Sequence, residues 1–184
     1  MTPTNPTAKP SHPQDWRQQL RSPQFWLKQC RDLAIMALIL YGVSLYLQRD
    51  MITGQAPALS GITIDGSQLA LNAAKTEPTL VYFWGTWCPV CRVTSPMVET
   101  VAQDHRVISV AAASGSDSDI QTYMNKHQYH FPVFNDDSGE QSANWGAIAF
   151  PAIYIIDTQG NIRYVTSGAT SSWGMKFRLW LAQF

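Results

Sequence analysis

The stretch 80–91 constrains the fold more than any other part of the chain, because it combines an apolar run, a glycine and two closely spaced cysteines. It opens with Leu-Val-Tyr-Phe-Trp, a β-branched and aromatic run that is typical of a buried strand. The run stops at Gly85, and Cys-Pro-Val-Cys follows shortly after it. Pro89 suits the first turn of a helix, where its missing N–H leaves no bond unmade. The stretch therefore predicts a strand, a turn and a helix that begins at Cys88.

A cysteine at the start of a helix has a physical reason to be reactive. Unpaired backbone N–H groups and the helix dipole favour an anion there, so the thiolate of Cys88, the nucleophilic form, is stabilised. Cys91 follows one helical turn later, close enough to close a Cys88–Cys91 disulfide. A C-x-x-C pair placed between a strand and a helix indicates a redox motif.

Two other uses of such a pair fit this sequence less well. Half of a zinc site would need two more ligands at suitable spacing. The third cysteine is the distant Cys30, and the H-x-x-H formed by His127 and His130 begins well beyond finger spacing. A purely structural disulfide is also a poor fit, because cysteines this close constrain almost no loop of the unfolded chain. We therefore expect redox chemistry and no metal.

An apolar segment near the N-terminus predicts a membrane anchor. Residues 33–47 carry no charge, and the Phe-Trp-Leu at 25–27 can extend them towards the ~20 residues that a bilayer needs. Basic residues lie mainly before the segment, at Lys9, Arg17, Arg21, Lys28 and Arg31, with Arg49 alone close behind it. The positive-inside rule then predicts a cytoplasmic N-terminus and an exported remainder.

This interpretation divides the chain into four parts. They are a basic, partly disordered cytoplasmic tail (1–32), a transmembrane anchor (33–48), a linker (49–57) and a folded domain (58–184). A cleaved signal peptide is the alternative, because Ala56-Pro57-Ala58 loosely resembles a cleavage site, although the basic lead-in is unusually long. Lys plus Arg and Asp plus Glu both number 13, and this even balance gives no indication of nucleic-acid binding.

Periodicity and turn residues predict the elements of the folded domain. We expect a hairpin over 61–71, strands at 80–84, 107–112, 131–134, 152–156 and 161–165, helices at 88–104, 120–126 and 171–183, and a helical turn at 141–145. Strands alternating with helices predict a mixed α/β fold around one sheet.

Some side chains are expected to share a face or to form turns. In the helix after Cys88, residues at four-residue spacing should lie together (Val93, Met97, Val101), and the helix should kink at Pro96. In the last helix, three aromatic residues should lie on one face (Trp173, Phe177, Trp180). Asp136 and Asp137 are expected to be turn residues.

With this order of elements the chain resembles the thioredoxin fold, and within it the membrane-tethered TlpA/ResA/DsbE group of thiol:disulfide oxidoreductases. The resemblance spans 58–184 and is carried by Phe83-Trp84-x-x-Trp87-Cys88-Pro89-x-Cys91-Arg92, Pro96, Phe150-Pro151 and the run 155–162. It implies a thioredoxin-like α/β fold with an N-terminal hairpin and a central insertion, preceded by one transmembrane helix. It also implies an enzyme without a cofactor, facing the periplasm from a bacterial inner membrane. The Cys-Pro-Val-Cys motif and the short anchor most resemble the ScsD branch, which is linked to suppression of copper sensitivity.

The resemblance also implies roles for single residues. Cys88 would be the nucleophile and Cys91 the resolving cysteine. Pro151 would be a cis-proline opposite the pair, and with Phe150 it would offer backbone to an extended substrate. Trp87, Pro89 and Val90 would shape substrate docking, although ordinary packing is an equal alternative for Trp87. Arg92 would either lower the pKa of the Cys88 thiol or simply be solvated.

The sequence departs from the group at two positions that matter for proton transfer. Many members carry a glutamate three residues after the second cysteine, where this chain has Thr94. Thioredoxin has a buried aspartate one residue before the Phe-Trp pair, where this chain has Tyr82. Either carboxylate would help to deprotonate the resolving thiol. Water, Tyr82 or Thr94 remain as routes, and the roles of the haem-handling members become less applicable.

Three hypotheses about function follow. The first is a reductase of disulfide-bearing exported proteins, recharged by a membrane electron donor of the DsbD/ScsB type. The second is a copper- or zinc-binding module that uses the two cysteines as soft ligands. The third is an oxidant that donates disulfides, which differs from the first only in reduction potential. A thioredoxin for cytochrome c maturation is a further alternative within the same chemistry.

Overall fold

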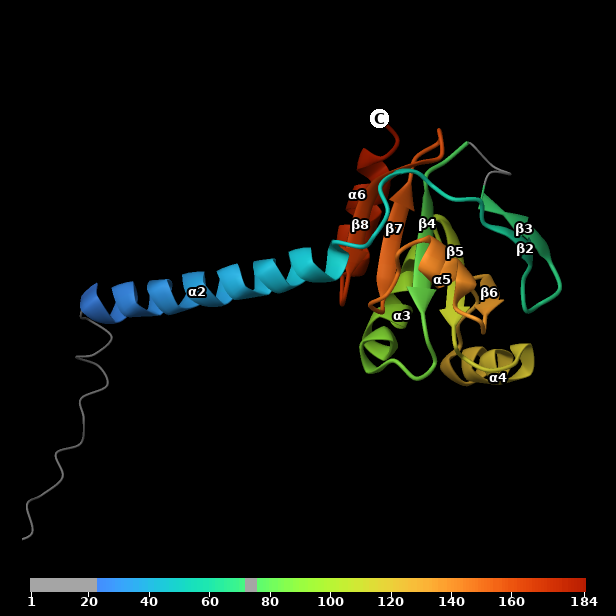
Figure 1. Ribbon diagram of the computed structural model, residues 1–184, viewed down its shortest axis with the longest axis horizontal. Helices are drawn as coiled ribbons and strands as arrows, with labels where there is room; N and C mark the ends of the chain where they lie inside the picture. Colours follow the sequence, from blue (N-terminus) through green and yellow to red (C-terminus); the bar gives the residue numbers. More distant parts are fainter. Residues whose placement is uncertain (1–22, 72–75) are drawn as a thin grey trace, which may run out of the picture. The chain divides into compact units, whose positions relative to one another are not determined.

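The computed structural model describes residues 23–71 and 76–184, in two compact units that divide between Val43 and Ser44. The described part of the first unit consists of the first twenty-one residues of helix α2, and the second unit contains all of the strands (Figure 1). Predictions about the tail before residue 23, including its basic residues, lie outside the described residues.

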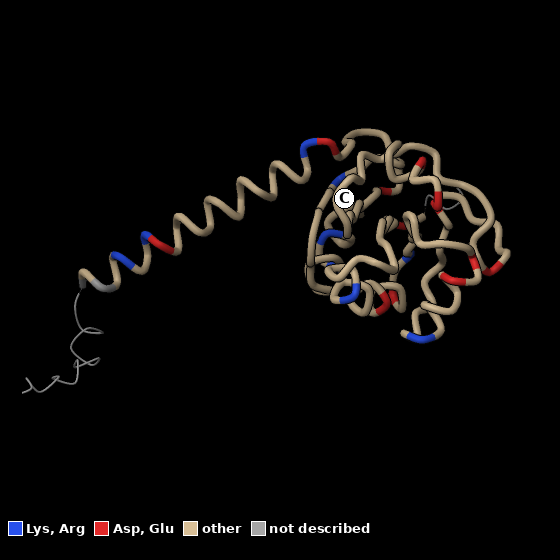
Figure 2. Tube along the Cα trace, turned by 60° about the horizontal axis from the view of Figure 1, so that its bottom comes forward, with Lys and Arg blue, Asp and Glu red and all other residues tan. Residues whose placement is uncertain are grey.

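Helix α2 (Pro23–Gln48) contains a stretch, Trp26–Gln48, that is long and apolar enough to cross a membrane. The helix therefore starts before Leu33, because the apolar run continues through the preceding Trp-Leu despite Lys28 and Arg31. Figure 2 shows charged residues near both ends of this helix and none along its middle. That distribution suits a segment whose middle lies in hydrocarbon.

The second unit is built on a six-stranded sheet in the order β1-β8-β7-β4-β5-β6. The strands are β1 (Gly54–Gln55), β4 (Thr79–Trp84), β5 (Arg106–Ala112), β6 (Val133–Asp136), β7 (Ala152–Ile156) and β8 (Asn161–Ser167). β4 pairs parallel with β5 and antiparallel with β7. Each predicted strand is therefore present within a few residues, and β4 lies near the centre of the sheet as its apolar sequence requires.

Every residue of β4 is buried, because both faces of the sheet are covered. Its alternate side chains Leu80, Tyr82 and Trp84 pack in a cluster with α3 (Pro89–Ala102), α4 (Asp117–His127) and α6 (Ser172–Leu181). The residues between them, Val81 and Phe83, pack in a second cluster that includes Trp145, next to α5 (Glu140–Asn144). The sheet thus separates two apolar layers (Figure 1).

The predicted hairpin is present as a separate two-stranded sheet of β2 (Ser60–Ile62) and β3 (Gln68–Ala70). Part of the segment 49–57, interpreted above as a linker, is packed on the domain instead. Met51 is buried in the second cluster, and β1 pairs with β8. Gly146 has a φ of +64° and passes so close to this segment that a Cβ there would lie 1.8 Å from the carbonyl oxygen of Asp50.

The predicted face of α3 is wrong, whereas the predicted aromatic residues of α6 do share a face, on the outside of the helix. On α3 the buried residues are Cys91, Thr94, Ser95, Val98 and Val101, whereas Val93 is exposed. The strict four-residue spacing was a poor guide because a helix turns every 3.6 residues, so the buried stripe alternates steps of three and four. On α6, Met175 and Leu179 are buried and the aromatic row faces outward.

Asp136 is also more than a turn residue, because its side chain is buried at the end of β6. Its carboxylate accepts hydrogen bonds from the backbone N–H groups of Gln141 and Ser142 and from the Ser142 hydroxyl. The carboxylate therefore satisfies donors in the first turn of α5, where a negative charge is favoured.

Candidate active site

The two cysteines lie where β4 ends and α3 begins. Cys88 is the N-cap residue of α3, with an extended backbone (φ −84°, ψ 116°), and Pro89 is the first helical residue. The turn is closed by a hydrogen bond from the Cys88 N–H to the Gly85 carbonyl. The predicted strand, turn and helix are confirmed, with Cys88 as the N-cap and the helix itself beginning one residue later, at Pro89.

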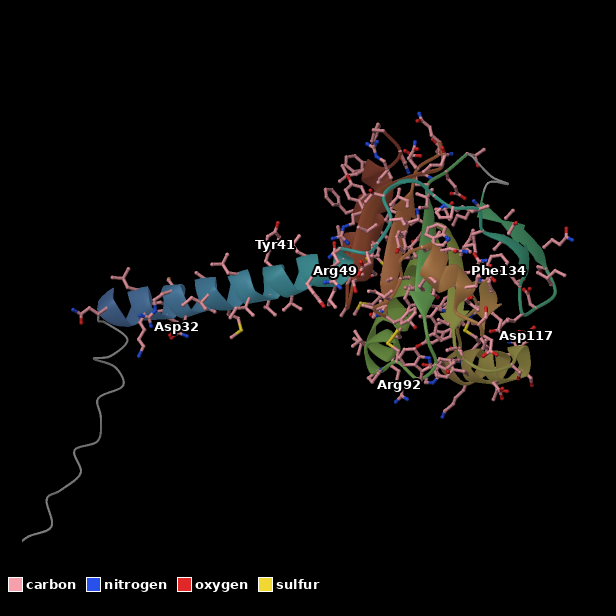
Figure 3. All side chains as sticks on the ribbon, viewed as in Figure 1. Asp32, Tyr41, Arg49, Arg92, Asp117 and Phe134 are labelled. Carbon is pink, nitrogen blue, oxygen red and sulfur yellow. A yellow bond between two sulfur atoms is a disulfide. The ribbon has the colours of Figure 1, made fainter. Side chains whose placement is uncertain are left out.

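Cys88 and Cys91 form a disulfide with a Cα–Cα distance of 5.2 Å. The Sγ of Cys88 accepts a hydrogen bond from the backbone N–H of Cys91 at 3.1 Å. In the dithiol state the same N–H can hold a Cys88 thiolate, and a hydrogen bond to a charged acceptor is the stronger kind. Both cysteines are buried, Cys91 completely, so the outer sulfur is the one that a substrate can approach. In Figure 3 the yellow disulfide bond lies near the labelled Arg92.

The second half of the site comes from the start of β7. The Phe150–Pro151 peptide bond is cis. The carbonyl oxygen of Phe150 lies 3.7 Å from the Sγ of Cys88, a distance at which the reduced thiol can donate to it. These two residues, far from the cysteines in the sequence, therefore border the sulfur pair.

Trp87 connects the two halves. Its indole N–H donates to the Ala112 carbonyl at 3.1 Å, and its ring meets the Phe150 ring edge-on at 5.7 Å. The side chain is still 52% exposed, so one face of the ring is open to a partner. Gly85 makes this position possible, because a Cβ at residue 85 would lie 2.6 Å from the indole nitrogen. Trp87 is thus fixed at the rim of the site and is not a core residue.

Apolar side chains that lie near the cysteines or near Phe150 in the sequence are exposed. Val90 and Val93 from α3 and Ile148 from the loop before β7 are all exposed. Among the predicted docking residues, the structure brings Trp87, Val90 and Phe150 to this rim, and Pro89 lies in the first turn of α3. Ile148 was not identified from the sequence, although its place two residues before Phe150 could have suggested it.

Ser114 is a second residue that sequence reasoning missed. Its hydroxyl accepts a hydrogen bond from the Thr86 N–H at 3.1 Å and donates to the Ala112 carbonyl at 3.0 Å. It follows β5, the parallel neighbour of β4, so both strands end at the same edge of the sheet. Ser114 therefore holds the turn that carries the cysteines, and the parallel order of the strands was the signal that could have found it.

Tyr82 and Thr94 carry hydroxyl groups at the two positions where the resemblance to thioredoxin and to the TlpA/ResA/DsbE group leads us to expect a carboxylate. The hydroxyls of Tyr82 and Ser95 are hydrogen-bonded at 2.9 Å, and both residues are fully buried. Burial raises the pKa of Tyr82 far above its ordinary value, which outweighs the opposing effect of the bond to Ser95. The Thr94 hydroxyl donates to the Val90 carbonyl within α3. Both side chains are already engaged in structural hydrogen bonds.

The remaining charged candidates interact with side chains other than the two cysteines. Burial raises the pKa of Tyr123, and the positive charge of Arg92 opposes that rise, so Arg92 acts on this tyrosine. His130 pairs with Glu99 at 3.1 Å, and His127 packs on Tyr123 and Tyr129. Within residues 23–71 and 76–184, no three His, Cys, Asp or Glu side chains are grouped so that they could hold a metal ion.

Comparisons with known proteins agree with this geometry. The model of the AhpC/TSA family matches residues 52–165. A thioredoxin-like protein of Haemophilus influenzae is 34% identical over 160 residues, which cover 86% of this chain and 95% of that protein. The thiol:disulfide interchange protein DsbE of Pseudomonas aeruginosa is 33% identical over 95 residues, or 51% of this chain and 53% of that protein.

A solved structure shows the same fold. The thiol:disulfide interchange protein of the thioredoxin family from Chlorobium tepidum superposes with a TM-score of 0.62 at 25% identity, covering 71% of this chain and 97% of that chain. The thioredoxin-like α/β fold is shared with that structure. The chain therefore belongs to the AhpC/TSA family, as a thioredoxin-like thiol–disulfide oxidoreductase of the ResA/DsbE/TlpA type.

Proposed function

We propose that this enzyme is a membrane-tethered reductase that acts on disulfides of exported proteins in the periplasm. The observation that carries the proposal is the cap geometry of Cys88, whose sulfur accepts the N–H of Cys91 at the start of α3. That geometry stabilises a thiolate on the outer cysteine. The apolar span of α2 supports attachment to the inner membrane, and the basic residues before it support a cytoplasmic N-terminus.

In the proposed reaction the reduced enzyme supplies two electrons. The Cys88 thiolate attacks one sulfur of the target disulfide, so an enzyme–substrate S–S bond forms and the substrate's own S–S bond breaks. The departing substrate sulfur leaves as a thiolate and takes a proton. Cys91 then loses its proton and attacks the Sγ of Cys88, which releases the second substrate thiol. The enzyme ends with the Cys88–Cys91 disulfide, and the substrate has gained two electrons and two protons.

The rim residues would orient the target for this attack. An extended substrate segment can lie along the backbone of Phe150 and Pro151, 3.7 Å from the attacking sulfur. Trp87, Val90 and the first-turn Pro89 would then provide an apolar surface beside it. We assign removal of the Cys91 proton to water, because the hydroxyls of Tyr82 and Thr94 are held in structural hydrogen bonds.

An oxidising periplasm requires a source of electrons for such a reductase. We propose a membrane donor of the DsbD/ScsB type, which would reduce the Cys88–Cys91 disulfide by the reverse exchange. The Cys-Pro-Val-Cys motif and the short anchor support a place near the ScsD branch and its link to copper tolerance. No observation on the described residues favours a copper- or zinc-binding module over thiol exchange.

A trapping experiment tests the assignment of the two cysteines. In the Cys91→Ala variant the mixed disulfide cannot be resolved, so exported proteins should accumulate on Cys88 and be identifiable by mass spectrometry after non-reducing purification. The matched control is Cys88→Ala, which should trap few. Equal trapping by both variants would contradict the assigned roles. Insulin reduction and the measured reduction potential of the pair then decide between reductase and oxidant.

A further inference from the structure

The outer face of α6 carries a row of exposed aromatic side chains. Trp173, Phe177, Trp180 and Phe184 are 85%, 57%, 51% and 86% exposed. They recur at steps of four, three and four, so they share one side of the helix and its C-terminal extension. The ring of Trp180 lies 6.0 Å from that of Phe177 and 5.5 Å from that of Phe184, centroid to centroid. Exposed large apolar side chains that gather on one side of a helix are candidates for an interaction surface.

This face is external because α6 uses its other side for packing. Met175 and Leu179 are buried in the cluster beneath α6, and the helix packs against α3. The side chain of Arg178 also holds α6 to the sheet edge by donating to the Thr166 hydroxyl of β8 at 2.9 Å. The fold is therefore satisfied without the aromatic row.

The same edge of the sheet receives the chain that arrives from α2. β1 pairs with the beginning of β8, and β8 is the strand to which Arg178 attaches α6. Only Arg49 and Asp50 lie between Gln48, the end of the apolar span, and Met51, which is already buried in the domain, so the two are three residue steps apart. Three residues of extended chain reach about 10 Å. The short connection thus keeps Met51 close to the end of the apolar span.

We propose that the aromatic row of α6 inserts into the interfacial layer of the membrane that anchors the chain. Tryptophan and other aromatic side chains favour the headgroup region, where an apolar ring and a polar edge are both satisfied. The basic residues of α6 are engaged within the domain, Lys176 with Asp104 and Arg178 with Thr166, so the exposed rings and not these charges carry the proposal. Because the anchor keeps the local concentration of membrane high, even weak insertion would be well populated. This inference rests on the membrane attachment proposed above.

Site-directed spin labelling of the full chain in lipid nanodiscs tests the inference. The disulfide occupies Cys88 and Cys91, so a maleimide nitroxide reacts with Cys30 alone in the native chain. In a Cys30→Ser background, Phe177→Cys places the label on the row and Ile62→Cys places it on an exposed apolar position of β2 as the matched control. Nanodiscs with one chain each, with and without phosphatidylglycerol, are compared by accessibility to oxygen and to a water-soluble nickel chelate.

We expect the label at 177 to resemble the label at Cys30, with a ratio of oxygen to nickel accessibility several-fold higher than at 62. Adding Trp173→Ser and Trp180→Ser should return the 177 label to the values found at 62. If the label at Cys30 is shielded from nickel but the label at 177 is exposed, the insertion of α6 is wrong while the membrane anchor stands. If the label at Cys30 is also exposed to nickel, both the membrane anchor and the insertion of α6 are wrong. Shielding at 177 that requires two chains per disc would identify a second copy as the partner and overturn the proposal.

Discussion

The buried hydrogen bond between Tyr82 and Ser95 yields a prediction that separates a structural role from a catalytic one. Their hydroxyl oxygens are 2.9 Å apart, and both residues are fully buried between β4 and α3. Tyr82→Phe or Ser95→Ala alone leaves one buried hydroxyl without its partner, so each should lower the free energy of unfolding by about 1–3 kcal/mol. The double variant removes both groups, and its loss should be smaller than the sum by about 1–2 kcal/mol.

The assay is guanidinium unfolding of the oxidised full chain in mild detergent, followed by tryptophan fluorescence. A Cys30→Ser background removes the free thiol that would otherwise attack the disulfide. The dependence on denaturant should stay the same for all variants, because the surface exposed on unfolding hardly changes. Strictly additive losses would refute the claim that the two hydroxyls depend on each other.

The same variants test whether Tyr82 carries the proton of Cys91. Burial raises the pKa of Tyr82 above its ordinary value of about 10, so the hydroxyl stays neutral at physiological pH and is a poor base. Tyr82→Phe should therefore leave the rate of resolution of a mixed disulfide within about twofold, a change of less than 0.5 kcal/mol in the barrier. A tenfold slower resolution in a correctly folded variant would refute the assignment of the proton to water.

The raised pKa of Tyr82 also predicts how stability depends on pH. The folded state favours the neutral phenol, so this contribution is fully present below about pH 10, where unfolded tyrosines are also neutral, and is lost as pH rises above that value. Wild type should lose stability more steeply than Tyr82→Phe in this alkaline range. Parallel curves for the two proteins would contradict the burial of a neutral phenol.

Three further substitutions test the rim and its support. Trp87→Ala removes the ring contact with Phe150. We expect kcat/KM for protein disulfides to fall about tenfold, or about 1.4 kcal/mol, while a small-molecule disulfide is reduced nearly as fast as by the wild type. Equal losses of kcat/KM for both substrates would contradict a docking role. Gly85→Ala brings a Cβ to 2.6 Å from the Trp87 indole nitrogen, so the ring should be displaced and the tryptophan fluorescence should change; unchanged fluorescence would contradict the close contact. Asp136→Asn weakens the acceptor of the Ser142 hydroxyl and N–H. It should lower the free energy of unfolding by about 1–3 kcal/mol without changing the reactivity of the cysteines. Slower thiol–disulfide exchange with an unchanged free energy of unfolding would contradict a purely structural role.

The cysteine side of the site could be predicted from the sequence because its information is local. The apolar run that ends at Gly85 and the proline after Cys88 determine a strand, a turn and a helix within a dozen residues. The roles of side chains that depend on distant partners could not be predicted. Ser114 holds the turn only because β5 is parallel to β4, and nothing near Ser114 in the sequence states that order.

Periodicity predicted which residues share a face but not which face is buried. On α6, Met175 and Leu179 alternate with Trp173, Phe177 and Trp180, so both sides of the helix are apolar. Hydrophobicity alone would favour burial of the larger aromatic side, yet the smaller Met and Leu fill the space above the sheet. The orientation of such a helix can be assigned only when its neighbours are known. An apolar side that remains exposed then calls for a functional explanation.

The position of the Phe150 carbonyl follows from strand register, which explains how residues so distant in the sequence meet. β4 and β7 are antiparallel, with Phe83 opposite Ala152, so the two residues before Ala152 extend towards the turn that leads to Cys88. A slip of one residue in this pairing would exchange the two faces of β7 and carry the cis peptide away from the sulfur. The pairing of β4 with β7 is regular, and the irregularity of β7 lies in its pairing with β8 between Ile155 and Ile156, at the opposite end of the strand. The irregularity therefore leaves the register of β4 and β7 unchanged at the end of the strand that leads to the cysteines.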